Sequence, residues 1–238
     1  YGELAAEWGE CVSGPDGPEA LTRLEVDRSH LLQAAEYWLD RGDTRALQVV
    51  TGLRWMALLR GPVYQFRELV QRAVELASEE EEPEYEAILW DTSAQIALVT
   101  GRRERATSNI RRALEAAEGT SARVRATVER TAGLVESASA PERARERLEA
   151  AFEVAEEADD DFLRARILER IAYVDVRLFN LTRAEEEFER AHRLLSGGRS
   201  PLFEADSVAG IAYVAHRQNR LEASIEKFEE VVRLHREN

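Results

Sequence analysis

Residues 171–174 read Ile-Ala-Tyr-Val, and residues 211–214, forty positions later, read Ile-Ala-Tyr-Val again. The two stretches continue to match at the same offset, at the pairs Arg177 and Arg217, Leu181 and Leu221, Phe188 and Phe228, Arg193 and Arg233, and Leu194 and Leu234. So many identities at one offset indicate an internal repeat, and repeats of this length are stacked structural units. This repeat decides the fold of the chain.

Each unit also carries a triplet spaced i, i+4 and i+7, in which a large apolar residue stands between two small ones. The triplets are Ala106–Ile110–Ala113, Ala144–Leu148–Ala151, Ala184–Phe188–Ala191 and Ser224–Phe228–Val231, with a looser one at Phe66–Val70–Ala73. This spacing places all three residues on one face of a helix. Because small residues let neighbouring helices approach closely, we expect Ala113, Ala151 and Ala191 to lie at tight contacts between helices.

The composition is typical of helices: charged residues make up 33% of the chain, whereas it has only 13 glycines and 6 prolines. Pro62, Pro83, Pro141 and Pro201 stand where helices should begin, because the first helical N–H needs no partner. Residues 9–19 are rich in glycine and proline and are expected to form a loop. The pattern predicts helices near residues 27–41, 43–60, 62–80, 84–101, 103–118, 121–138, 141–157, 161–179, 182–195, 201–219 and 221–237.

The clearest unit reads Trp90, Ala94, Ala97, Gly101, Ala106, Ile110 and Ala113. Its order of large and small residues resembles the tetratricopeptide repeat (TPR) family, although Ala94 and Ala97 stand where that family has Gly and Tyr. The period is nearer 40 residues than the usual value of about 34. The resemblance implies an all-α, right-handed superhelix. We expect about five helix pairs, at 43–80, 84–118, 121–157, 161–195 and 201–237, after N-terminal connector helices over 1–42.

The N-terminal quarter carries a second signal. Residues 24–35 read Leu-Glu-Val-Asp-Arg-Ser-His-Leu-Leu-Gln-Ala-Ala, with Trp38, Gly42-Asp43 and Arg60-Gly61 following. These motifs resemble the segment that joins the NTPase part to the helical repeats in large bacterial signal-transduction ATPases, including LuxR-type transcriptional regulators. The departures lie at residues 29–30 and 65–66, where that family has Asn and Glu-Gly. The resemblance implies a sensor or regulatory arm of a longer protein, as does an N-terminal residue that is Tyr1 and not Met.

Charge and cysteine content exclude several classes of protein. The net charge is −14, which argues against binding of nucleic acid through this region, because a phosphate backbone requires a positive face. Cys11 is the sole cysteine, so no internal disulfide can form and a reducing cytoplasm is expected. The sequence has neither an apolar run of membrane-span length nor a signal peptide, so we expect no membrane association.

We find no catalytic motif in the sequence. It lacks a phosphate-binding loop of the G-x-x-x-x-G-K type, a G-x-S-x-G elbow and an H-E-x-x-H motif. No two of the four histidines are spaced i, i+4. We therefore expect a binding module that is not an enzyme, without a cofactor or a metal.

The TPR resemblance implies that the first helix of each pair lines a concave surface and that its ninth position points into it. On that register, Tyr173 and Tyr213 are each followed four residues later by an arginine, which lies on the same helix face. Paired aromatic and guanidinium groups suit an anionic ligand. The alternative is that the tyrosines pack between repeats and the arginines pair with Glu169 and other acidic neighbours. The expected ligand-binding residues are Trp55, Gln95, Tyr173, Arg177, Tyr213, His216 and Arg217.

Three functions stay open at this point. The first is the sensor or regulatory arm of a cytoplasmic bacterial signal-transduction or transcription-regulatory ATPase, which binds a protein, a peptide or a small anionic effector. The second is a free-standing TPR adaptor or scaffold for protein–protein interaction, for which self-association is possible. The third is a helical nucleic-acid-binding or enzymatic domain, for which the sequence shows neither a basic stripe nor a convergent polar site.

Overall fold

The structure is a computed structural model that describes residues 1–61 and 63–237. These residues form helices and turns, without a strand among them. Pro62, expected to begin a helix, lies outside the described residues, and the next helix starts at Val63. Within the described ranges, none of the helices combines the length and the apolar character that a bilayer span requires. The helices are α1 (Gly2–Cys11), α2 (Gly17–Val26), α3 (Arg28–Leu39), α4 (Arg45–Gly52), α5 (Arg54–Arg60), α6 (Val63–Glu79), α7 (Pro83–Val99), α8 (Arg103–Ala116), α9 (Ala122–Glu136), α10 (Pro141–Glu157), α11 (Asp161–Arg177), α12 (Leu181–Leu195), α13 (Pro201–Arg217) and α14 (Leu221–Glu237).

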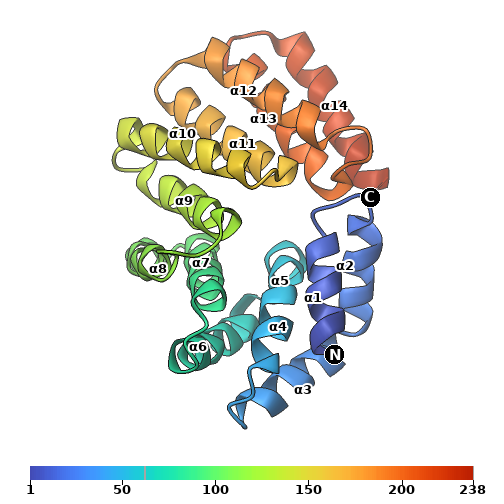
Figure 1. Ribbon diagram of the computed structural model, residues 1–238. Coiled ribbons are helices and arrows are strands. Elements are labelled where there is room, and N and C mark those ends of the chain that lie inside the picture. The colour runs from blue at the N-terminus through green and yellow to red at the C-terminus, as the bar shows by residue number, and fades with distance from the viewer. Residues whose placement is uncertain (62, 238) are drawn as a thin grey trace.

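From α7 onward, the chain forms helix pairs that stack into a right-handed superhelix (Figure 1). The pairs are α7–α8, α9–α10, α11–α12 and α13–α14, and the first helix of each pair also contacts the first helix of the next. The expected TPR-type fold class is therefore confirmed. Ala113, Ala151 and Ala191 are fully or almost fully buried, as expected for the small residues of the repeated triplet.

The turn inside a pair has the same backbone form in three of the pairs. Gly101, Phe179 and Asn219 each have a positive φ, of +73°, +62° and +60°. In each case the N–H of the following residue donates to the carbonyl four positions before the left-handed residue, as in the bond from Asn180 N to Asp175 O. This is the Schellman end of a helix, in which the left-handed residue is usually glycine. The expected helix boundaries place a turn at each of these three points, although only Gly101 is a glycine.

The N-terminal part differs from the expected regular pair. The helix expected over 43–60 is two helices, α4 and α5, which meet at Leu53. The chain also forms α2 from Gly17, inside the segment expected to be a loop. The break at Leu53 lies where α1 packs across α4. A Cβ on Gly52 would lie 2.1 Å from the Ala5 carbonyl oxygen, so the two backbones touch directly where α4 ends. The start of α2 has a local reason, because Pro18 stands in its first turn, where a helix tolerates proline.

The superhelix turns back on itself, so that α1 and α2 lie beside α13 (Figure 1). The Ser200 hydroxyl donates to the Ser13 carbonyl oxygen at 2.5 Å. Next to this bond, the rings of Trp55, Phe162 and Phe203 pack edge to face, with centroids 4.9–5.8 Å apart. Edge-to-face packing is a favoured geometry for aromatic rings. These contacts connect the N-terminal helices to the last repeat.

Candidate ligand-binding cavity

A cavity of about 720 Å³ lies on the inner side of the superhelix, and we call it the central cavity. Its wall is formed by α1, the junction of α4 and α5, and the inner helices α7, α9 and α11. It exists because α1 closes the curve that the inner helices begin. Its volume falls within the range of small-molecule and short-peptide sites, which is about 300–1,000 Å³.

One side of the central cavity is apolar. Trp55 and Phe162 line it, and Phe203 is buried behind them. Ile88 and Leu163 continue this side along α7 and α11. The Arg54 guanidinium lies 5.1 Å from the Trp55 ring centroid, which places a cation at the edge of the aromatic wall.

The other side carries arginines that differ in their partners. Arg123 pairs with Asp160 at 3.0 Å. Arg166 pairs with Asp206 at 2.7 Å and with Glu169 at 2.8 Å. These two guanidinium groups are therefore neutralised within the chain.

Arg54 and Arg130 are different, because no carboxylate of the described residues forms an ion pair with either. Arg130 is only 5% exposed, and its one hydrogen bond is a donation from a terminal guanidinium nitrogen to the Thr131 hydroxyl at 3.3 Å. A guanidinium has five N–H donors, so most of the donors of Arg130 have no partner among residues 1–61 and 63–237.

Asp91 is a carboxylate that lies near both cations without forming an ion pair with either among the described residues. Burial raises the pKa of Asp91, while the charges of Arg130 and Arg54 oppose that rise. The pKa of Arg130 is lowered to about 10, mainly by burial, with the charge of Asp91 opposing the fall and those of Arg170, Arg166 and Arg54 adding to it. At neutral pH, a second anion beside Arg130 would therefore be electrostatically favoured.

Two of the expected ligand-binding residues lie in the central cavity. Trp55 contributes to the aromatic wall, and Gln95 lines the opposite side. The Gln95 side-chain amide donates to Asp91 Oδ2 at 2.7 Å, so it also orients that carboxylate.

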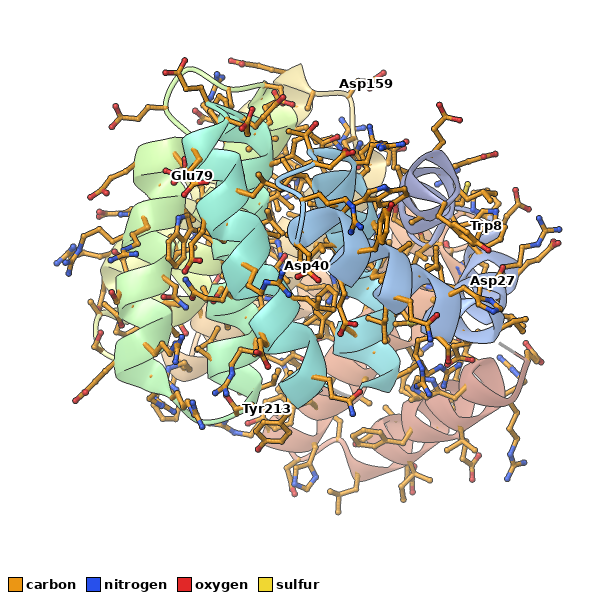
Figure 2. The ribbon with its side chains drawn as sticks, turned by 90° about the horizontal axis from the view of Figure 1, so that it is seen from below. Trp8, Asp27, Asp40, Glu79, Asp159 and Tyr213 are labelled. Carbon is orange, nitrogen blue, oxygen red and sulfur yellow. The ribbon has the colours of Figure 1, made fainter. Side chains whose placement is uncertain are left out.

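The other five expected residues lie elsewhere, since none of them is among the residues lining the central cavity. Tyr173 and Tyr213 are each 38% exposed, and Figure 2 shows Tyr213 at the margin of the molecule. Arg217 donates to the Tyr213 hydroxyl at 3.1 Å, whereas Arg177 donates to the Ala138 carbonyl oxygen at 3.3 Å. His216 is exposed. Whether these residues bind a ligand stays a prediction.

Sequence inspection missed Arg54, Asp91, Arg130 and Arg166 as lining residues. A signal was present, because Asp91 and Arg130 interrupt the apolar pattern of inner helices at positions that prove to be buried. The alternative expectation is that Glu169 pairs with Arg177 or Arg217. In the structure its carboxylate pairs with Arg166 instead.

No protein-family model matches this sequence, and no curated protein matches it either. Several solved structures are similar. One is BtubC from P. vanneervenii, with a TM-score of 0.66 and 16% identity over 91% of both chains. Another is NprR in complex with its cognate peptide NprX, with a TM-score of 0.67 and 14% identity over 99% of this chain and 78% of that one.

A third similar structure is a signal transduction ATPase with numerous domains and a tetratricopeptide repeat sensor, from Pyrococcus horikoshii. Its TM-score is 0.60 at 13% identity, over 92% of this chain but only 32% of that one. At such low identities a likeness shows the fold alone. The chain has the fold of a tetratricopeptide-type repeat domain.

Proposed function

We propose that the chain is a ligand-binding TPR module that takes up a short peptide in its central cavity. The observation that carries this proposal is the cavity itself, lined on one side by aromatic rings and on the other by the buried Arg130 without a carboxylate partner. Burying a charge without a partner costs several kcal/mol or more, so a structural core gains nothing from this arrangement. A ligand with an anionic group would supply the partner that the buried Arg130 guanidinium lacks.

We further propose that this module is the sensor arm of a larger bacterial signal-transduction ATPase or transcriptional regulator in the cytoplasm. Two findings support this context. The N-terminal motifs resemble the segment that precedes the repeats in such ATPases, and similar structures include a peptide complex and a repeat sensor of a signal transduction ATPase. A ligand in the central cavity would contact α1, α5 and α11 together and would stabilise the closed form of the superhelix.

Peptide uptake is tested by selecting binders from a random heptapeptide library and measuring their dissociation constants by calorimetry. The Thr127→Trp variant places an indole in the central cavity, which Thr127 lines, and we expect it to abolish binding. The Thr107→Trp variant is the matched control, because Thr107 is exposed on α8, and it should bind as the unaltered protein does. Selected peptides that bind both variants equally would contradict the proposal.

A second candidate function is that of an adaptor that binds a protein at the rim formed by Tyr173, Arg177, Phe179, Tyr213 and Arg217. The observation in its favour is Phe179, whose side chain is 76% exposed although its residue adopts a left-handed backbone. The Arg217 guanidinium lies 5.5 Å from the Phe179 ring centroid and 5.8 Å from that of Tyr213. Heptapeptides that bind Thr127→Trp but not the double variant Arg177→Ala, Arg217→Ala would favour this function.

A further inference from the structure

The arginines that line the central cavity differ in whether they form ion pairs within the described residues. Arg123 and Arg166 form ion pairs with Asp160, Asp206 and Glu169. Arg54 and Arg130, from α5 and α9, both lie near the carboxylate of Asp91, which forms no ion pair with either among the described residues, and Asp160 and Glu10 also act on Arg54. This group of three side chains carries a net charge of +1 at neutral pH.

Arg130 is the centre of this group. Its side chain is only 5% exposed, yet it lines the central cavity. It donates one hydrogen bond, to the Thr131 hydroxyl. Arg54 lines the same cavity and is half-buried. Both guanidinium groups line the same cavity, and each can donate a charge-assisted hydrogen bond to one oxygen of a bound carboxylate.

The surroundings define the ligand further. Because Arg54 stacks near Trp55 and Phe162 packs against Trp55, a bound anionic group would lie next to the aromatic wall. A single negative charge neutralises the group of Arg54, Arg130 and Asp91, whereas a dianion such as phosphate would be repelled by Asp91. The chemistry therefore favours a carboxylate beside an apolar side chain.

We propose that Arg54 and Arg130 form a carboxylate-binding subsite of the central cavity, which takes a ligand whose carboxylate adjoins an aromatic or aliphatic side chain. The inference rests on the proposed uptake of a ligand by this cavity. The carboxylate comes from a peptide C-terminus or from a free organic acid, which have the same chemistry at this subsite.

The test compares three probes, N-acetylphenylalanine, N-acetylphenylalaninamide and phenyl phosphate, by protein-observed NMR titration. We expect the acid to bind at least about tenfold more tightly than the amide, because hydrogen bonds between a guanidinium and a carboxylate are stronger than those to a neutral amide. Asp91→Asn should tighten binding of the acid, since it removes the competing carboxylate. Equal affinity for acid and amide, or tighter binding of phenyl phosphate than of the acid, would overturn the subsite.

Variants then assign the preference to the two arginines. Arg130→Gln and Arg54→Gln should each bring the ratio of acid to amide affinity close to one, whereas Arg111→Gln, exposed on α8, should preserve it. Arg54→Gln keeps the test valid if Arg130→Gln fails to fold by circular dichroism. A preference for the acid that survives in Arg54→Gln would refute the assignment, as would failure of both probes to bind.

Failure of this subsite and failure of peptide uptake can be told apart. If selected heptapeptides are lost in Thr127→Trp but bind equally well with a free or an amidated C-terminus and without acidic residues, the cavity takes up peptides and the carboxylate subsite is wrong. If acidic and amidated heptapeptides both bind Thr127→Trp as tightly as the unaltered protein, the proposal of peptide uptake by the central cavity is wrong as well. If heptapeptides with a free C-terminus and N-acetylphenylalanine both bind more tightly than their amides, the carboxylate comes from a peptide C-terminus. If only N-acetylphenylalanine binds more tightly than its amide, the carboxylate comes from a free organic acid.

Discussion

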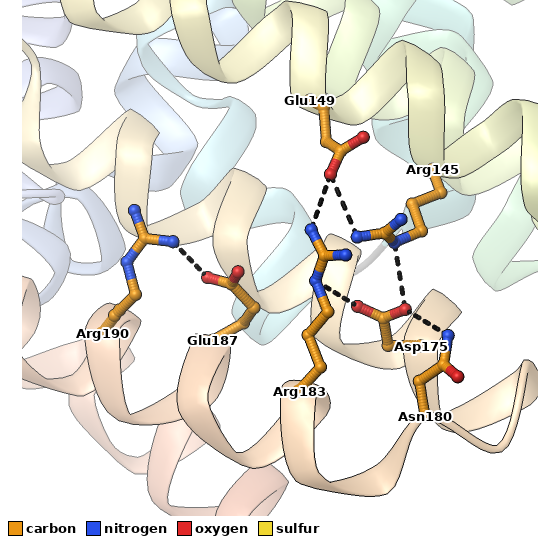
Figure 3. A network of polar contacts seen from close by, with 7 residues as sticks. All are labelled: Arg145, Glu149, Asp175, Asn180, Arg183, Glu187 and Arg190. Atoms are coloured by element: carbon orange, nitrogen blue, oxygen red, sulfur yellow. Dashed lines mark hydrogen bonds and ion pairs between the residues drawn. The ribbon is translucent and has the colours of Figure 1, made fainter.

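At the residue scale, Asp175 is a carboxylate held out of solvent where α10, α11 and α12 meet (Figure 3). Its oxygens lie 3.0 Å from Arg145 Nε and 3.6 Å from Arg183 Nε, and one accepts a hydrogen bond from the Asn180 amide at 3.1 Å. The same two arginines reach Glu149 on α10. The network therefore joins two successive repeats by polar contacts.

Replacing Asp175 should be much more harmful than replacing Glu149. Asp175→Ala leaves Arg145 without its buried partner, and we expect it to lower the free energy of unfolding by about 3–5 kcal/mol. Glu149→Ala removes a partly exposed partner of the same arginines and should cost about 1 kcal/mol or less. Urea unfolding of the two variants, followed by circular dichroism, measures the difference. Equal losses would show that Asp175 acts only as a surface charge.

The backbone of Phe179 is strained, because the left-handed conformation costs a non-glycine residue about 1–2 kcal/mol. We expect Phe179→Gly to raise the free energy of unfolding by about 1 kcal/mol, since the exposed ring has little packing to lose. Ser139→Gly, in an exposed turn at ordinary φ, is the matched control and should lower it by about 0.5–1 kcal/mol. Thermal unfolding of both variants tests this, and a loss of stability in Phe179→Gly would mean that its ring packs more than its exposure indicates.

At the scale of the helix, the repeated triplets set the distance between neighbouring helices. Ala151 on α10 is buried, whereas the adjacent Ala150 on the same helix is exposed. Ala151→Leu should overpack the interface and lower the free energy of unfolding by about 1–3 kcal/mol. Ala150→Leu adds the same atoms on the solvent side and should change it by no more than about 0.5 kcal/mol. Chemical denaturation distinguishes the two, and a tolerated Ala151→Leu would refute the close packing of this face.

At the scale of the whole molecule, contacts between α2 and α13 distinguish this chain from an open repeat array. In an open array each repeat contacts only its neighbours, so the ends fray independently. Here the bond between Ser13 and Ser200 and the cluster of Trp55, Phe162 and Phe203 connect the first helices to the last repeat. The central cavity depends on this closure, because α1 forms one of its walls.

The stability of the whole molecule should also depend on pH. Burial raises the pKa values of Glu169, Asp91 and Glu187, with nearby arginines opposing the rise. A carboxyl with a raised pKa keeps its proton in the folded state at a pH where the unfolded chain has lost it. Folded stability therefore increases as the pH falls through the raised values towards the ordinary ones, 4.5 for glutamate and 3.8 for aspartate.

We accordingly expect the melting temperature to rise as the pH is lowered from neutral towards these ordinary values. Asp43, whose pKa is lowered to about 2 by its hydrogen bonds to Arg45, loses its stabilising charge only in more acidic solution and does not oppose this trend. Glu169→Gln should flatten the pH dependence, while Glu222→Gln, exposed on α14, should leave it unchanged. A melting temperature that falls steadily over this range would contradict the expectation.

The sequence by itself determined most of the helices, the forty-residue repeat and the buried face of α8, α10 and α12. On α14 the expected face is not buried, because Phe228 is 45% exposed. Helical periodicity is a local property, so the spacing of Ala144, Leu148 and Ala151 predicts which side is buried without knowledge of the partner helix. The same locality explains why the Tyr173–Arg177 and Tyr213–Arg217 pairs were found. It could place them on one helix face, but it could not establish that this face lines the cavity.

Only the tertiary structure decided where the cavity lies and which charges meet in it. Arg54, Asp91 and Arg130 come from three helices far apart in the chain, and they converge because small rotations between successive repeats add up to a closed curve. The break at Leu53 and the closure by α1 depend on direct backbone contact between Gly52 and Ala5, which no local pattern encodes. Hydrophobic periodicity indicates which face of each helix is exposed to solvent. The position of the site depends instead on the packing angles between all of the helices.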